Sequence, residues 1–302
     1  MSAGMALSRR FWEQCGEPAF RALAPELLDR IAVGLVGEGS ECFGFDDELS
    51  RDHDWGPGFC VWLEDGELPV HGPLLQAIYD GLPDRFEGYA VKRTPGRVGV
   101  FGREAFFRHF LGCIPERPTD WLAVPEYALA TCTGGQVFRD PPGRFTQTWQ
   151  YLRQPPEPVR QKKLAARCVT MLQSGQYNLP RCRRRGDNLA ASLAVGEFIT
   201  AAAGAMLLLN GRWAPFYKWL PASLRALPGP GPELERQLTC LASCPEAAAQ
   251  DALVTCCCDL VADELRRQGL TALPGSDMQR LGLDIQSHIT DEELRRLPVL
   301  VG

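Results

Sequence analysis

The sequence predicts an α+β fold, in which a small mixed sheet with flanking helices spans residues 1–150 and an all-helical bundle spans residues 151–302. Short apolar runs with the length of buried strands lie between residues 31 and 138. From Pro155 onward the pattern changes to long Ala/Leu-rich or amphipathic runs, which indicate helices. A helical bundle appended to a small sheet accommodates both patterns.

The first domain is expected to open with helix and continue into strands. Residues 6–29 carry apolar side chains at roughly helical spacing, with an interruption near Gly16. The apolar runs 31–36 and 59–63 predict two buried strands. The further elements are expected, in order, to be a helix, a strand, a helix and a strand, at 74–79, 97–101, 103–111 and 136–138. The turn residues from Asp140 to Gly143 then close this region.

Three long helical runs are expected in the second domain. They cover 159–172, 188–210 and 232–268, and Pro and Gly separate them.

A glycine-rich turn and a pair of acids form the most informative motif. Gly39 and Ser40 follow the first predicted strand, where a turn exposes backbone N–H groups that can hold phosphate. Asp52 and Asp54 lead into the second predicted strand, in which residues i and i+2 project from one face about 6.5–7 Å apart. Two carboxylates so placed can bind one Mg²⁺. The alternative is that this acidic, glycine-rich segment is a solvated connection.

At these residues the chain resembles the nucleotidyltransferase superfamily typified by DNA polymerase beta and the aminoglycoside nucleotidyltransferases, which carries a Gly-Ser turn followed by an Asp-x-Asp pair. The sequence of residues 37–59 resembles one branch of this superfamily, the domain-of-unknown-function family 4037. Later segments resemble the same branch, and they lie at 120–122, 135–140, 173–178 and 215–219. The resemblance implies the fold, magnesium-dependent nucleotide chemistry, phosphate binding at Gly39 and Ser40, and metal binding at Asp52 and Asp54.

The resemblance also implies a third carboxylate on a strand beside the Asp-x-Asp pair. The predicted strand at 97–101 carries no acid. Glu104 lies just beyond it, Asp140 ends another strand, and Glu197 falls in a helix. The sequence leaves open which of these substitutes, or whether none does.

Charge and composition narrow the function classes. A net charge of -5 repels phosphate polymers, so nucleic acid is an improbable partner. No run of about 18 consecutive apolar residues occurs, and the chain does not begin with a charged-then-apolar signal pattern. We therefore expect a cytoplasmic protein without a membrane partner, its twelve cysteines mostly reduced.

Positive charge for a triphosphate is expected from the second domain. Four arginines lie within residues 181–185, and on a helix Arg181 and Arg185 share one side, so we expect these two to face inward. Lys218 lies among aromatic residues, where an anionic partner would compensate its charge. The alternative for the arginine run is a solvated helix face.

The leading hypothesis is an Mg²⁺-dependent nucleotidyltransferase that moves a nucleoside monophosphate from an NTP, ATP or GTP, to a small-molecule or protein acceptor. In it Gly39, Ser40, Arg181, Arg185 and Lys218 bind the nucleotide. The missing third acid supports a competing hypothesis, a catalytically inactive nucleotide-binding or scaffold protein of the same fold. An RNA-directed transferase is a third class, which the net negative charge disfavours.

Overall fold

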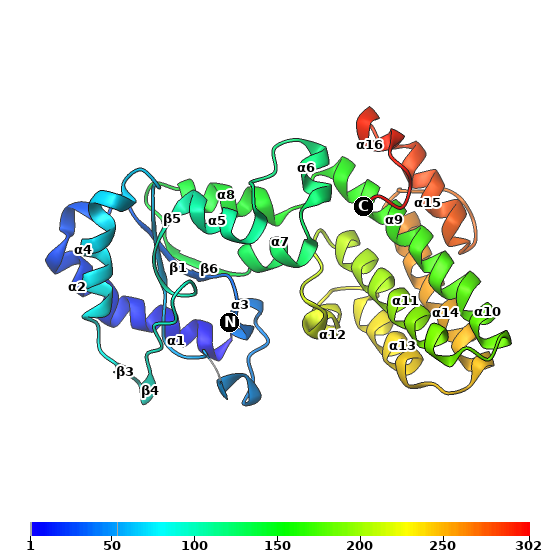
Figure 1. Cartoon of the computed structure of the whole chain (residues 1–302), viewed down its shortest axis with the longest axis horizontal. Coiled ribbons are helices and arrows are strands. Elements are labelled where there is room, and N and C mark those ends of the chain that lie inside the picture. The colour runs from blue at the N-terminus through cyan, green and yellow to red at the C-terminus, as the bar shows by residue number, and fades with distance from the viewer. Residues whose placement is uncertain (1, 53) are drawn as a thin grey trace. The chain divides into compact units, whose positions relative to one another are not determined.

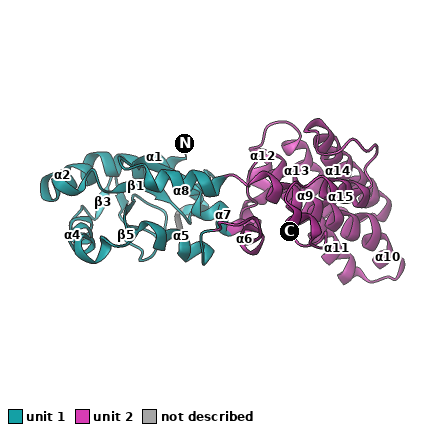
Figure 2. Ribbon diagram, turned by 90° about the horizontal axis from the view of Figure 1, so that it is seen from above, with its two compact units in different colours: residues 1–114, 128–153 teal, residues 115–127, 154–302 magenta. Residues whose placement is uncertain are grey.

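The computed structural model describes residues 2–52 and 54–302, and the side chains of Arg51 and Asp52 lie outside the description. The fold is α+β, as the sequence predicts, with one four-stranded mixed sheet, flanking helices and a further helical unit (Figure 1). Unit 1 comprises residues 1–114 and 128–153, and unit 2 comprises 115–127 and 154–302 (Figure 2). The predicted boundary at 150/151 lies within the last helix of unit 1, and segment 115–127 groups with unit 2 instead of the first domain.

Unit 1 alternates helices and strands. Its helices are α1 (Ala3–Phe11), α2 (Glu17–Leu23), α3 (Ser40–Phe43), α4 (Leu68–Asp80), α5 (Arg103–Leu111), α7 (Glu126–Cys132, which starts in segment 115–127) and α8 (Arg144–Arg153). Its strands are β1 (Ala32–Val36), β2 (Cys60–Leu63), β3 (Arg85–Phe86), β4 (Tyr89–Ala90), β5 (Gly99–Gly102) and β6 (Gly135–Arg139). A π-helical segment, Trp12–Gly16, joins α1 to α2, so the helix continues where an interruption was expected.

The four predicted strands form the sheet, in the order β5-β2-β1-β6. β1 runs antiparallel to β2 and β6, and β2 runs parallel to β5. Gly34 pairs with Cys60, so the end of β1 lies beside the start of β2. Gly34 also marks an irregularity in the pairing with β6, and a Cβ there would collide with the backbone of Gln136.

Helices cover both faces of this sheet (Figure 1). On one face, Val33, Val61 and Leu63 pack with buried residues of α1, α2 and α4, Phe11 and Leu75 among them. On the other, the Trp62 ring stacks on Phe145 of α8 with centroids 3.8 Å apart, and Phe106 of α5 meets Trp62 edge-on. Burial of these rings, together with the aliphatic side chains around them, stabilises unit 1.

In its described residues, unit 2 contains helices and connecting loops but no strand. Its helices are α6 (Pro118–Ala123), α9 (Glu157–Met171), α10 (Leu179–Arg184), α11 (Asn188–Leu209), α12 (Leu220–Arg225), α13 (Gly231–Ser243), α14 (Ala247–Arg267), α15 (Met278–Ser287) and α16 (Glu292–Arg296). A π-helical segment, Leu172–Asn178, joins α9 to α10. The long run expected at 232–268 divides into α13 and α14 around Pro245, which lacks a backbone donor.

The centre of unit 2 is the packing of α9 against α11 and α15. Gly175 permits a close approach, because a Cβ there would overlap the buried Phe198 ring of α11. By length and composition, α11 is the one described helix that could cross a membrane. More than half of its most apolar window, 56%, is buried inside the protein, as in the core helix of a water-soluble bundle.

Candidate functional site

The glycine turn follows β1 directly, as the sequence predicts. Gly37 and Gly39 adopt φ values of 118° and 113°, which side-chain-bearing residues rarely adopt. A Cβ at Gly39 would also collide with the side chains of Arg97 and Glu41. Ser40 then starts the short helix α3, and no backbone N–H of Gly39 or Ser40 is paired within the described part of the chain. The turn therefore presents free donors at the end of a buried strand.

A buried ion pair packs against this turn. Glu41 is 3% exposed, and its carboxylate accepts from Arg97 Nη2. Burial raises the pKa of the Glu41 carboxyl, while the Arg97 guanidinium acts in the opposite direction. The sequence analysis missed both residues. The adjacency of Glu41 to Ser40 was a usable signal for the first, whereas Arg97 becomes a neighbour only when β5 joins the sheet.

Asp54 lies in a bend six residues before β2, not on a strand. The expectation that Asp52 and Asp54 share a strand face is therefore wrong, because Asp52 ends a 3-10 helix (Leu49–Asp52) and Pro57 interrupts the approach to β2. Asp54 is exposed, and Thr94 Oγ1 donates to its Oδ1 at 2.8 Å. The side chain of Asp52, and His53 between the two acids, lie outside the described residues.

The turn and Asp54 nevertheless lie at the same edge of the sheet. The antiparallel register of β1 and β2 brings the end of β1 to the start of β2. The segment from Thr94 to Arg97 bridges them, since Arg97 contacts Glu41 beside the turn and Thr94 holds Asp54. The Arg97 N–H donates to Thr94 O at 3.1 Å, which couples the two ends of this bridge.

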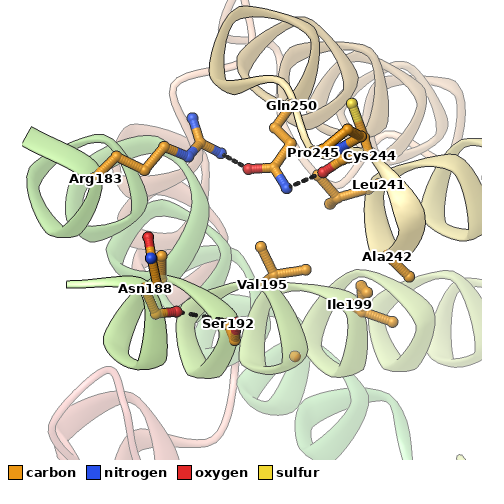
Figure 3. Close-up of a pocket in the computed structure, with 12 residues that line it drawn as sticks. Arg183, Asn188, Ser192, Val195, Ile199, Leu241, Ala242, Cys244, Pro245 and Gln250 are labelled. Atoms are coloured by element: carbon orange, nitrogen blue, oxygen red, sulfur yellow. Dashed lines mark hydrogen bonds between the residues drawn. The ribbon is translucent and has the colours of Figure 1, made fainter. Parts of the chain in front are cut away.

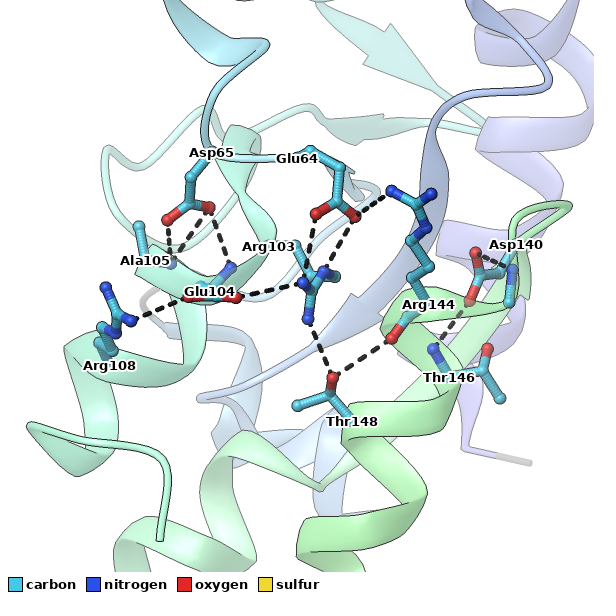
Figure 4. A network of polar contacts seen from close by, with 11 residues as sticks. Glu64, Asp65, Arg103, Glu104, Ala105, Arg108, Asp140, Arg144, Thr146 and Thr148 are labelled. Atoms are coloured by element: carbon cyan, nitrogen blue, oxygen red, sulfur yellow. Dashed lines mark hydrogen bonds and ion pairs between the residues drawn. The ribbon is translucent and has the colours of Figure 1, made fainter. Parts of the chain in front are cut away.

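Two candidates for the third carboxylate lie at the end of the sheet opposite the glycine turn. Glu104 follows the end of β5, beside the end of β2, and Asp140 follows the end of β6, beside the start of β1. In the polar network of Figure 4, Glu104 accepts from Arg103 and Arg108, and Asp140 accepts from the backbone N–H groups of Gly143 and Thr146. Glu197 is exposed on α11 of unit 2. Both acids of unit 1 therefore serve the local structure.

The described residues supply only part of a magnesium site. Among them, no three His, Cys, Asp or Glu side chains cluster as metal ligands. Asp54 fits the chemistry of Mg²⁺, because it is an exposed carboxylate whose Oδ2 has no partner in the described part of the chain. The side chain of Asp52, which the sequence predicts as the second ligand, lies outside the described residues.

The predicted cations of unit 2 are placed differently from expectation. Arg181 stacks on the Tyr177 ring and donates to its hydroxyl at 2.6 Å. Arg185 is exposed, whereas Arg183 turns inward and pairs with Asp251 at 2.6 Å, so the expected inward pair of Arg181 and Arg185 is wrong for Arg185. The helical spacing misleads here because α10 ends at Arg184 and packs its Arg183 side toward α14.

Lys218 is exposed and lies over the Trp219 ring, 4.9 Å from its centroid. The neighbouring rings of Phe216 and Tyr217 are also exposed. Whether Arg181, Arg185 and Lys218 face the glycine turn stays a prediction.

Comparisons with known proteins assign no activity to the chain. Residues 121–220 match the family model described as Domain of unknown function (DUF4037). This match excludes the glycine turn and Asp54. One similar solved structure is the crystal structure of a nucleotidyltransferase-like protein from Exiguobacterium sibiricum 255-15, with a TM-score of 0.38 and 13% identity over 91% of this chain and 81% of that one. That likeness is too weak to assign an activity, and no curated protein matches the chain.

Proposed function

We propose that the protein is a nucleotidyltransferase-like protein that binds the triphosphate of an NTP at residues 37–40 and transfers its nucleoside monophosphate to an acceptor hydroxyl or phosphate, releasing pyrophosphate. The observation that supports this most is the convergence of the preformed glycine turn and Asp54 at one edge of the sheet, bridged by Thr94 and Arg97.

The turn is suited to phosphate because its unpaired N–H groups are fixed before a ligand arrives. Gly37 and Gly39 adopt their positive φ angles without steric cost, so the turn already has this form without a ligand. The Arg97–Glu41 pair acts behind the turn as a positioning contact, and Glu41 balances the charge of Arg97.

The charge of this edge favours a metal-bound nucleotide over a free one. Glu38, Asp47, Glu48 and Asp54 are exposed acids of one connected segment, and they repel a bare triphosphate. Mg²⁺ held by Asp52 and Asp54 would offset part of that repulsion and neutralise charge on the transferring phosphoryl group. Further positive charge is proposed to come from Arg181, Arg185 and Lys218, and ATP or GTP is the expected donor.

Titration calorimetry with ATP and GTP, with and without Mg²⁺, tests this function. Asp54→Asn should abolish Mg²⁺-dependent binding, whereas Glu48→Gln, which removes one charge from the same exposed segment, should leave it nearly unchanged. Equal binding by wild type and Asp54→Asn would remove Asp54 from the site. A pyrophosphate-release assay with candidate acceptors then tests transfer.

A binding protein without turnover is the second candidate. It is favoured by the position of Glu104 and Asp140, which lie at the edge opposite the turn and are engaged by arginines or backbone donors. Tight Mg²⁺-dependent nucleotide binding without pyrophosphate release from any acceptor would support this candidate over the enzyme. Like the enzyme, the binder is expected to be cytoplasmic.

A further inference from the structure

The two halves of α11 have opposite environments. Residues 201–209 are all buried in unit 2. The first half instead exposes two leucines, Leu189 at 73% and Leu193 at 67%. These residues lie four apart on one ridge of the helix, and Glu197 continues the same ridge as an exposed acid. The two leucines form a small exposed apolar patch on this half of the helix.

A groove lies along the neighbouring side of the same helical half (Figure 3). Its volume is about 390 Å³, and Val195 and Ile199 of α11 line it opposite Leu241 and Pro245. Its polar groups are largely engaged already, since Arg183 bonds to Asp251 and Gln250, and Gln250 donates to Cys244 O at 2.6 Å. The groove therefore combines an apolar wall with polar groups that are largely engaged within the chain.

Charges at the two ends of this surface are complementary to each other. Arg184 and Arg185 are exposed beside the start of α11, and neither has an ion-pair partner among the described residues. Glu197 lies about 9 Å along the helix from residue 191, the midpoint of the two leucines. Arg184 ends α10 and Arg185 caps it, so both lie just before α11 begins at Asn188.

We propose that this surface binds a second copy of the chain, through two antiparallel α11 helices related by a two-fold axis near residue 191. In that register Leu189 faces Leu193 of the other copy, and Arg184 and Arg185 face its Glu197. A self-complementary patch is what a two-fold interface requires. Ser192 and Gly196 on the next ridge, which also line the groove, allow the helices to approach closely.

The test measures the molar mass of the full chain by size-exclusion chromatography with light scattering over a wide range of protein concentration. Wild type should reach twice the mass of one chain. Leu189→Glu combined with Leu193→Glu should weaken association at least about a hundredfold. Leu283→Glu, at an exposed leucine of α15, is the matched control and should leave the mass unchanged.

Charge reversal tests the register. Glu197→Arg should weaken association about tenfold, because the two-fold axis repeats each repulsive contact. Adding Arg184→Glu to it should restore most of the loss. A wild type with the mass of one chain at every concentration would overturn the proposal, and so would a dimer that the leucine variants leave intact. Leucine-dependent binding of monomeric wild type to lipid vesicles would equally overturn it, in favour of a membrane surface.

Discussion

Removal of Arg97 should destabilise unit 1 strongly. Arg97→Met keeps an unbranched apolar stem but leaves the Glu41 carboxylate, 3% exposed, without its cation. Breaking a buried pair in this way costs about 3–5 kcal/mol, since the remaining charge keeps its desolvation penalty. With an urea m-value of about 2 kcal/mol/M, the unfolding midpoint should fall by about 2 M.

Double substitution separates the pair from the packing around it. Glu41→Gln removes the charge but keeps an acceptor, so Glu41→Gln with Arg97→Met should be more stable than Arg97→Met alone. Urea unfolding measures this, and hydrogen exchange of β1 assigns the transition to unit 1, because the two units need not unfold together. A loss below about 1 kcal/mol for Arg97→Met, the range of an exposed pair, would refute the reasoning.

The pH dependence gives the same prediction a second readout. Burial raises the pKa of Glu41 in the folded protein, and loss of Arg97 should raise it further. Above the unfolded pKa, the folded state of Arg97→Met then binds more protons than the unfolded state, so its stability falls as pH rises. The deficit relative to wild type should be larger at neutral pH than in mild acid. A deficit that grows as the pH is lowered would contradict this sign.

Three further outcomes are expected. Ser40→Ala should weaken ATP binding by roughly ten- to a hundredfold, because it removes one hydrogen bond to a charged group. It should weaken AMP binding far less. Equal losses of ATP and AMP affinity in calorimetry would place the phosphates elsewhere. Lys162 is fully buried against the neutral acceptors Gln286, Pro298 and Val299, and burial lowers its pKa to about 8. The unfolded state therefore binds more protons between pH 8 and 10.5, and wild type should gain stability there relative to Lys162→Met; a flat difference between the two urea titrations would disprove the coupling. Gly175→Ala should lower the melting temperature, because its methyl group meets the Phe198 ring. An unchanged melting temperature would show that the Leu172–Asn178 segment and α11 can separate freely.

The strands and long helices were predictable because their apolar periodicity is local. The runs at 31–36, 59–63, 97–101 and 136–138 all became strands of one sheet, although their ends moved by one or two residues. The assignment of segment 115–127 to unit 2 was not predictable, since it depends on long-range contacts. Glu126, for example, accepts from Arg167 at 3.2 Å, and the Trp121 ring stacks on Trp213.

The candidate site was predictable only where a short motif determines it. Gly39 and Ser40 form the turn at the end of a strand because glycine backbone freedom is a local property. The failed inference concerned Asp54, where strand periodicity was extended across Gly56, Pro57 and Gly58 into a segment that is not strand. Arg97 is more than fifty residues from the turn in sequence, and only the parallel pairing of β5 with β2 brings it there.

Hydrogen exchange with mass spectrometry tests the central claim most directly, because it locates the nucleotide on the chain. With ATP and Mg²⁺ together, residues 36–45 should become protected, and ATP alone should give little protection there. Asp54→Asn should lose this protection, whereas Glu48→Gln should keep it. Unchanged exchange at residues 36–45 with saturating ATP and Mg²⁺, or equal protection without the metal, would contradict the proposed site.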